Sequence, residues 1–497
     1  MEASVNLCDY PWIPVAGQKE RKSLLQVFSD LSLRRLSGNP VDKIVILRLL
    51  LCIAHASNKI PDEEAWLALT PEILGKNAVT YLKEHYDEFF LYGEKPFLQF
   101  PQLGKIGGKA DSLGSLIVNV AEGNKVVLSG WNQFQELSQA EIIVLLLRSA
   151  CYACGGKKYD KNLTISKGIV KGATGRNGTL LGFKGYLHSY MLGENIVNTV
   201  KLNLLTEEEI NSTYAFPQGI GKPFWEAMPE GEQGETTEKY QQSYLGHLIP
   251  IDKFYLLMNT GIVKTDGINY PGHKDGLIDP ALTIFPDAKN PRAIWSSTTK
   301  RPWRELTSLF AFLESSTNKA PYFLSMGLRK MRFANLTHLT IWTGGMEVNS
   351  KLGEQYLSEK NDYVESEFCL PTTCLNSDGL DHLKDMIENA ELKSKQLSIC
   401  ITAYYKEMND DSPQKVADDG RTRYWELMES RAQTILELAF SDTTPEQRQE
   451  EQREWFKFIC DVYDEKCPHG TARQLAAWVK ANPRFITKDK KKQGENK

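Results

Sequence analysis

A glycine-rich and basic segment between residues 155 and 185 carries the residue types best suited to bind a polyanion. Glycine lets a backbone present its N–H groups to a ligand without a Cβ in the way, and Lys and Arg supply the charge opposite phosphate. The segment predicts contact with a nucleic-acid backbone, with a solvated surface loop as the alternative. Its glycines stand at 155, 156, 168, 172, 175, 178, 182 and 185, and its basic residues are Lys157, Lys158, Lys161, Lys167, Lys171, Arg176 and Lys184.

Two further groups of basic residues lie later in the chain. One interleaves with Trp295 and Trp303, and basic residues next to aromatic rings suit single-strand stacking and phosphate contact. The alternative is that the tryptophans belong to the core and the cations to a solvated face. The first group is Lys289, Arg292, Lys300, Arg301 and Arg304, and the second is Arg329, Lys330 and Arg332.

An apolar run from Ile341 ends in two glycines and a polar tip, Asn349-Ser350-Lys351. Asn, Ser and Lys at a tight turn can reach into a groove of duplex DNA, where the minor groove offers acceptors on A·T pairs and one donor on G·C pairs. The alternative is an ordinary hairpin turn.

Signals for catalysis are weak. The eight histidines show no metal-ligand spacing, no G-x-S-x-G motif occurs, and the stretch from Gly172 to Thr179 lacks the lysine of a phosphate loop. Cys151 and Cys154 have zinc-like spacing, but no second pair follows, which favours a buried thiol pair. The sequence therefore predicts a binding protein without a catalytic site, cofactor or metal. The alternative is a stand-alone nucleic-acid-processing enzyme with an unrecognised metal site.

Bulk composition restricts the class of protein. The chain has 497 residues, a net charge of −4 and 41% hydrophobic residues, so binding to nucleic acid must come from local patches rather than from the whole surface. Nine cysteines fit free thiols in a reducing cytoplasm. The first residues do not read as a signal peptide, and the most apolar stretch, 44–56, is shorter than the about 20 residues of a membrane span. We expect a cytoplasmic protein without membrane contact.

Local patterns predict an α+β body over residues 1–374. Ser138 followed by Glu141 and an apolar run predicts a capped helix over 138–153. Residues 96–101 are expected to be extended and packed on the core, and residues 216–243 to form a mobile insertion. Short apolar runs between turn signals predict antiparallel hairpins, with strands at 255–258, 282–285 and 339–342.

After residue 375 the periodicity becomes helical. Four helices of this length predict an antiparallel bundle. The predicted fold is thus a large mixed N-terminal domain with antiparallel hairpins, 1–374, followed by a C-terminal four-helix bundle, 375–497. The candidate helices are 379–408, 415–440, 445–466 and 469–481.

Several motifs occur together in a characteristic order. With them the chain resembles, over nearly its whole length, the large subunit of the type I-E CRISPR Cascade surveillance complex, the CasA family. The motifs are Trp12-Ile13-Pro14-Val15, the following SLLQVF, Lys95-Pro96-Phe97-Leu98-Gln99, the glycine-rich basic segment, the late Gly-Gly-x-x-x-Asn turn and the C-terminal helices.

The resemblance implies a non-catalytic, DNA-binding and RNA-binding subunit in antiviral defence. Such a subunit sits at the 5′ handle of the crRNA, reads a short protospacer-adjacent motif (PAM) in double-stranded target DNA, and wedges the strands apart to start R-loop formation. It also recruits a helicase-nuclease. The implied partners are crRNA, target DNA, the other Cascade subunits and that helicase-nuclease. A purely structural assembly subunit is a further alternative.

The resemblance also assigns residues. The PAM-side hairpin falls on Asn349, Ser350 and Lys351, with Ser350 where better-known members have glutamine. The family's glycine loop falls on 168–172. The full implied DNA and PAM set is Gly168, Lys171, Gly172, Arg176, Lys264, Asn349, Ser350 and Lys351, and the loop at the crRNA handle, 124–133, includes Asn124, Lys125 and Ser129.

Overall fold

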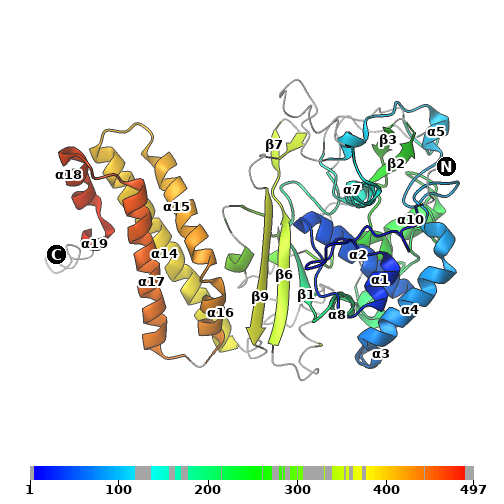
Figure 1. Ribbon diagram of the computed structural model, residues 1–497, viewed down its shortest axis with the longest axis horizontal. Helices are drawn as coiled ribbons and strands as arrows, with labels where there is room; N and C mark the ends of the chain where they lie inside the picture. The colour runs from blue at the N-terminus through cyan, green and yellow to red at the C-terminus, as the bar shows by residue number, and fades with distance from the viewer. Residues whose placement is uncertain are drawn as a thin grey trace. The chain divides into compact units, whose positions relative to one another are not determined.

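The computed structural model divides the chain into two compact units (Figure 1). Unit 1 comprises residues 1–298, 315–336 and 340–367, and unit 2 comprises 299–314, 337–339 and 368–497. The domain boundary expected after residue 374 stays a prediction. The structure describes residues 5–117, 136–155, 163–168, 177–213, 215–259, 261–270, 279–282, 284–285, 292–298, 300, 302–305, 330, 338–351, 354–357, 362–371, 377–441 and 443–486.

Helix α2 (Pro40–Ser57) is the centre of unit 1. It packs against α4, α7, α8 and α11, and nearly every side chain from Pro40 to His55 is buried. Asn39 caps its first turn by accepting a hydrogen bond from the Asp42 N–H, and Pro40 occupies the first helical position. A helix that is apolar all round has to be buried, so α2 sets the position of its neighbours.

The other helices of unit 1 are short and mostly capped by their own sequence. Helix α7 begins after the predicted box, in which Ser138 and Glu141 each accept from the other's backbone N–H, so this prediction is confirmed. The helices are α1 (Leu24–Ser29), α3 (Glu63–Ala68), α4 (Pro71–Glu84), α5 (Leu103–Ile106), α7 (Gln139–Cys151), α8 (Ile196–Leu202), α9 (Glu207–Asn211), α10 (Glu235–Gln241) and α11 (Tyr244–Leu248), with 3-10 turns at Tyr86–Phe89 and Leu113–Leu116.

Small antiparallel sheets complete the mixed fold, as predicted. One sheet has the order β1-β6-β9, and three hairpin-like pairs join β2 to β3, β4 to β5 and β7 to β8. The predicted runs at 255–258 and 339–342 lie in strands, and the run at 282–285 is a strand at its last two residues. The strands are β1 (His188–Leu192), β2 (Lys253–Met258), β3 (Gly261–Asp266), β4 (Ile284–Phe285), β5 (Arg292–Ala293), β6 (His338–Met346), β7 (Asn349–Lys351), β8 (Glu354–Tyr356) and β9 (Tyr363–Pro371).

Two local expectations are wrong. The segment at 96–101 is packed on the core but turns at Leu98, which has φ 57°, because Gln99 bonds Leu91 O and the Leu257 N–H on either side of it. Residues 216–243 are not a loose insertion. Phe224 and Trp225 are buried and Phe224 contacts the Phe97 ring at 5.0 Å.

Unit 2 is helical over most of its described length. Helix α14 packs along α15, α16, α17 and α18. The single helix predicted over 415–440 is divided at Ser430 and Arg431, where Arg431 turns to an ion pair with Glu451 of α17. The helices are α14 (Ser377–Glu407), α15 (Pro413–Glu429), α16 (Ala432–Phe440), α17 (Pro445–Lys466), α18 (Ala472–Ala481) and α19 (Pro483–Ile486), preceded by a 3-10 turn at Pro302–Glu305. The four-helix bundle stays a prediction.

A buried ion pair ties α2 to a distant part of unit 1. The Arg48 guanidinium contacts Asp279 Oδ1 at 2.5 Å and donates to Tyr190 Oη at 3.1 Å. Both charged side chains are almost fully buried. Burial alone would raise the pKa of Asp279, but the attraction of Arg48 and His188, together with the hydrogen bonds from Arg48 and the Ala281 N–H, lowers it overall. Among the described residues, no helix is both long and apolar enough to cross a membrane.

Candidate nucleic-acid interface

The predicted polar turn, Asn349-Ser350-Lys351, is a strand instead: it forms β7 and pairs with β8 in a hairpin, because residues 354–356 lie opposite it. Asn349 pairs with Tyr356, Ser350 with Gln355, and Lys351 with Glu354. Asn349 and Ser350 are exposed, whereas Met346 and Val348 just before them are buried. Exposed polar side chains at the start of β7 therefore follow directly on residues that are anchored in the core.

Gln355 of β8 joins this hairpin to both ends of the glycine-rich basic segment. The N–H of Gly155 donates to Gln355 Oε1 at 2.8 Å, and the N–H of Gln355 donates to Gly155 O at 3.1 Å. The Gln355 side-chain amide also donates to the carbonyls of Gly182 at 2.9 Å and Phe183 at 2.7 Å. One side chain thus fixes the two predicted DNA elements to each other.

The end of the segment also packs directly on the hairpin base. The Val348 N–H donates to Lys184 O at 3.1 Å. Gly185 has φ 90°, and a Cβ placed there would lie 1.7 Å from Met346 O. Only glycine fits this close approach of two backbones.

Within the glycine-rich basic segment, part of the predicted anion site is already occupied by a carboxylate. Glu232 accepts from the N–H groups of Ile165 (3.2 and 3.1 Å) and Ser166 (2.8 Å). Gly168, two residues after Ser166, has φ 83°, and no atom of the described residues lies within 4 Å of a Cβ placed there. The predicted residues Lys171, Gly172, Arg176, Asn124, Lys125 and Ser129 lie outside the described residues.

Lys264 is held in another hairpin, away from β7 in Figure 1. It lies on β3 opposite Tyr255, its side chain is 10% exposed, and its Nζ is 3.4 Å from Asp111 Oδ2. A phosphate would have to compete with that carboxylate. The structure brings Asn349, Ser350 and the ends of the glycine-rich basic segment together, but it does not bring Lys264 to them.

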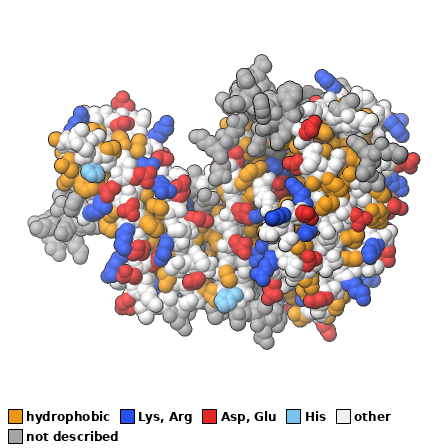
Figure 2. Space-filling model, viewed as in Figure 1, with side chains coloured by type: hydrophobic (Ala, Val, Ile, Leu, Met, Phe, Trp, Pro, Cys, Tyr) orange, Lys and Arg blue, Asp and Glu red, His pale blue; other side chains and the backbone are white. Residues whose placement is uncertain are grey.

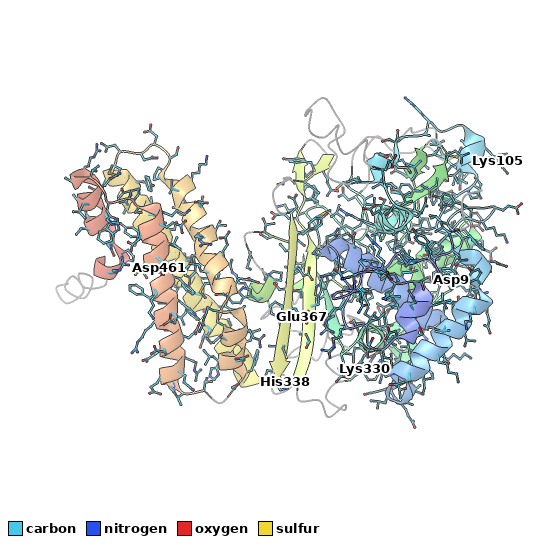
Figure 3. All side chains as sticks on the ribbon, in the orientation of Figure 1. Asp9, Lys105, Lys330, His338, Glu367 and Asp461 are labelled. Atoms are coloured by element: carbon cyan, nitrogen blue, oxygen red, sulfur yellow. The ribbon has the colours of Figure 1, made fainter. Side chains whose placement is uncertain are left out.

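The two later basic groups divide between core and surface. Trp303 is fully buried in unit 2 beside Trp425, and Arg304 lies 3.5 Å from the Trp425 ring centre. Lys330 is buried, pairs with Glu209 at 2.7 Å and lies away from β7 (Figure 3). Trp295, by contrast, is 38% exposed. The alternative of a core tryptophan applies to Trp303 but not to Trp295, and Lys330 is not on the solvated face that this alternative expected for the cations.

Charges on the visible face of the molecule are mixed. Figure 2 shows Lys and Arg side chains interspersed with Asp and Glu, which matches a net charge near zero. Any strong attraction to phosphate must therefore be local.

The candidate metal ligands give no cluster in the described part of the chain. No group of three His, Cys, Asp or Glu is placed there to hold an ion. Cys151 is buried and donates to Leu147 O, and burial raises the pKa of its thiol. Cys154 is partly exposed.

The roles of Gln355 and Glu232 were not predicted from the sequence. Gln355 bonds residues 172 to 200 positions away, and Glu232 bonds residues 66 and 67 positions away. No local pattern marks either side chain. Only the fold brings Glu232 to the glycine-rich basic segment.

Comparison with known proteins identifies the family. A family model described as CRISPR-associated protein Cse1 matches residues 6–464. No curated protein matches in sequence. Solved structures share the fold. Thermobifida fusca Cse1 is 20% identical with a TM-score of 0.75, covering 97% of both chains. Thermus thermophilus CasA is 17% identical with a TM-score of 0.70, covering 96% of this chain and 98% of its own.

A third match is a chain from a structure described as a CRISPR RNA-guided surveillance complex. It is 17% identical with a TM-score of 0.69, covering 97% of this chain and 99% of its own. The family resemblance predicted from the sequence is confirmed. Because one family model spans most of the chain and the fold recurs in solved members, the protein belongs to the CRISPR-associated Cse1 (CasA) family.

Proposed function

We propose that this chain is the non-catalytic large subunit of a type I-E Cascade complex, and that it recognises a PAM and starts strand separation. Membership of the Cse1 family and the likeness to a chain of an RNA-guided surveillance complex support the assembly. The single observation that carries the DNA role is the Gln355 junction, which holds an exposed polar hairpin beside a glycine-rich basic segment.

The division of labour follows from the chemistry of the two elements. Lysines and arginines of the glycine-rich basic segment, Lys171 and Arg176 among them, bind phosphates, which gives affinity that falls steeply with salt. Asn349 and Ser350 reach the minor groove. Its pattern of hydrogen-bond donors and acceptors distinguishes little more than A·T from G·C pairs, so several PAM sequences are accepted. Sequence specificity is left to pairing with the RNA guide.

The hairpin has the mechanical properties that a wedge needs. Asn349 and Ser350 on its first strand are polar and exposed. Just before them, the base of the hairpin is held by buried Met346 and Val348 and by the Val348 N–H bond to Lys184 O. Ser350 is shorter than glutamine, so opening rests on Asn349 and Lys351 as well. Unstacking one step costs a few kcal/mol, which an inserted element offsets by contacts with the opened DNA.

Further residues contact the nucleic acids in the same complex. Gly168, Gly172 and Lys264 contact DNA, and Asn124, Lys125 and Ser129 meet the crRNA handle. Residues 1–374 carry these contacts, while residues 375–497 form the four-helix bundle that meets target DNA and other Cascade subunits. The assembled complex then recruits the helicase-nuclease.

The test replaces Asn349 and Lys351 together with alanine in the assembled complex. We expect R-loop formation on an intact duplex to slow about 100-fold, because roughly 3 kcal/mol of help in opening the first step is lost. A target with a pre-opened, mismatched bubble should be bound almost as before. Stopped-flow measurement with a base analogue beside the PAM reports the opening.

The matched control replaces Lys76 and Thr80 of α4 with alanine. This pair likewise consists of one cation and one uncharged polar residue, and Lys76 and Thr80 are both exposed. It should leave both substrates unaffected. Equal losses on duplex and bubble would remove the wedge role. Metal-dependent cleavage by the isolated chain would favour an enzyme, and equal recognition of PAM-mutated targets would favour a structural subunit.

A further inference from the structure

Tyr186 and Trp295 form a stacked aromatic pair at the surface of unit 1. Their ring centres are 4.7 Å apart and their planes differ by 10°. Tyr186 is half-buried, and burial raises the pKa of its hydroxyl to about 12. Its ring packs so closely on Gly182 that a Cβ there would lie 2.3 Å from a ring carbon. Trp295 covers this fixed ring and remains 38% exposed.

A short chain of bonds connects the pair to the hairpin. Ser296, next to Trp295, donates its N–H to Gly185 O at 2.7 Å and its Oγ to Tyr186 O at 3.0 Å. Gly185 fits against Met346 O at the hairpin base. Gly185 therefore contacts both Ser296, which follows the stacked Trp295, and the base of the hairpin.

Exposed aromatic rings gather around this hairpin. In the part of the chain that the structure describes, the large aromatic side chains classed as exposed are Phe183, Trp295 and Tyr356, at 52%, 38% and 47%. Tyr356 pairs with Asn349 on the hairpin, and the Phe183 carbonyl accepts from Gln355. Lys184 is exposed beside them. Exposed apolar residues that are scattered singly over a surface are normal, whereas a group of them at one place indicates a binding surface.

We propose that Trp295, supported by Tyr186, is a stacking site for an unpaired base of single-stranded DNA. Every base has a π-face, so such a site binds without regard to sequence, and a neighbouring cation serves the phosphate. This inference deepens the proposed function, because a strand opened at the hairpin would pass over the ring. The stacking itself needs neither a PAM nor the other subunits.

The test uses the full-length chain alone at low salt. Fluorescence anisotropy compares a twelve-nucleotide thymidine oligomer with an oligomer of the same length whose sugars carry no bases. We expect the wild-type chain to bind the thymidine oligomer roughly tenfold more tightly, which is the lower range measured for one stacked base. Trp295→Ala should abolish the difference, whereas Trp295→Phe should keep most of it.

Matched variants separate this proposal from the wedge. Asn349→Ala should keep the ratio between the two affinities, because the Asn349 amide is not an aromatic ring on which a base can stack. Met258→Ala, another exposed apolar residue of unit 1, serves as the neutral control. Equal wild-type affinity for both oligomers would overturn the proposal even if Trp295→Ala failed to fold. Tighter binding of a uridine RNA oligomer, by roughly the same factor as one stacked base, would overturn the assignment to DNA.

Discussion

Replacing Gly185 with alanine is expected to displace the β7–β8 hairpin and to slow strand opening by the assembled complex by a factor of about 100 or more. The new Cβ would lie 1.7 Å from Met346 O, and the backbone has φ 90°. Alanine is disfavoured in this left-handed backbone conformation, and the steric overlap with the backbone oxygen adds to that cost. Together they destabilise the native position of the hairpin by roughly 3–5 kcal/mol. The hairpin base must then move away from Lys184.

Hydrogen exchange of the Val348 amide measures the displacement directly, because this N–H bonds Lys184 O. Gly17→Ala is the matched control. Gly17 also has a positive φ, 75°, but no atom of the described residues lies within 4 Å of the added Cβ, so only about 1 kcal/mol is expected. Unchanged Val348 exchange in Gly185→Ala would refute the fixed hairpin base.

Mild acid is expected to destabilise unit 1 through three buried histidines. Burial lowers the pKa of His55 to about 3 and those of His188 and His247 to about 4. Arg48 lowers the pKa of His188 further, and Lys330 lowers that of His55. In the unfolded chain histidine titrates near its ordinary value of 6.5.

The sign follows from where the proton binds. Above about pH 6.5 both states are neutral and the full stability is present. As the pH falls from about 6.5 toward 4, only the unfolded state takes up protons, so stability is lost. At about pH 5.5 each histidine accounts for about 1.4 kcal/mol, and the three together for roughly 4 kcal/mol.

Hydrogen exchange of α2 amides at about pH 7.5 and about pH 5.5, corrected for intrinsic rates, measures this loss. His55→Leu is the matched variant. The ring nitrogens of His55 have no hydrogen-bond partner among the described residues, so leucine removes the titration without breaking a bond. About a third of the pH effect should disappear. Equal protection of α2 at both pH values would contradict the prediction.

Local signals predicted some elements well. The Ser138–Glu141 box started α7 where expected because both partners lie within one turn. The glycines and polar residues that follow the apolar run indicated a hairpin near residue 349, but Asn349, Ser350 and Lys351 form its first strand rather than its turn, because they pair with residues 354–356. The break between α15 and α16 was missed because its cause, the Arg431–Glu451 pair, joins residues that are 20 positions apart.

The burial of the two tryptophans near the basic residues could not be predicted from local sequence either. Trp295 and Trp303 look alike in sequence, each close to basic residues. Trp303 is buried against Trp425, more than a hundred residues later, whereas Trp295 stacks on Tyr186 and stays exposed. Burial depends on what the remote chain brings to a ring, and no local pattern contains that information.

By itself, the sequence determined the family, the mixed fold and the presence of a polar hairpin near residue 349, because motif order and short-range periodicity are properties of neighbouring residues. Only the tertiary structure decided that Gln355 joins the glycine-rich basic segment to the hairpin and that Glu232 accepts hydrogen bonds from N–H groups of that segment. It also decided that residue 185 must be glycine. These contacts join residues far apart in the chain, and they form only where the packed core brings distant backbones within hydrogen-bond distance.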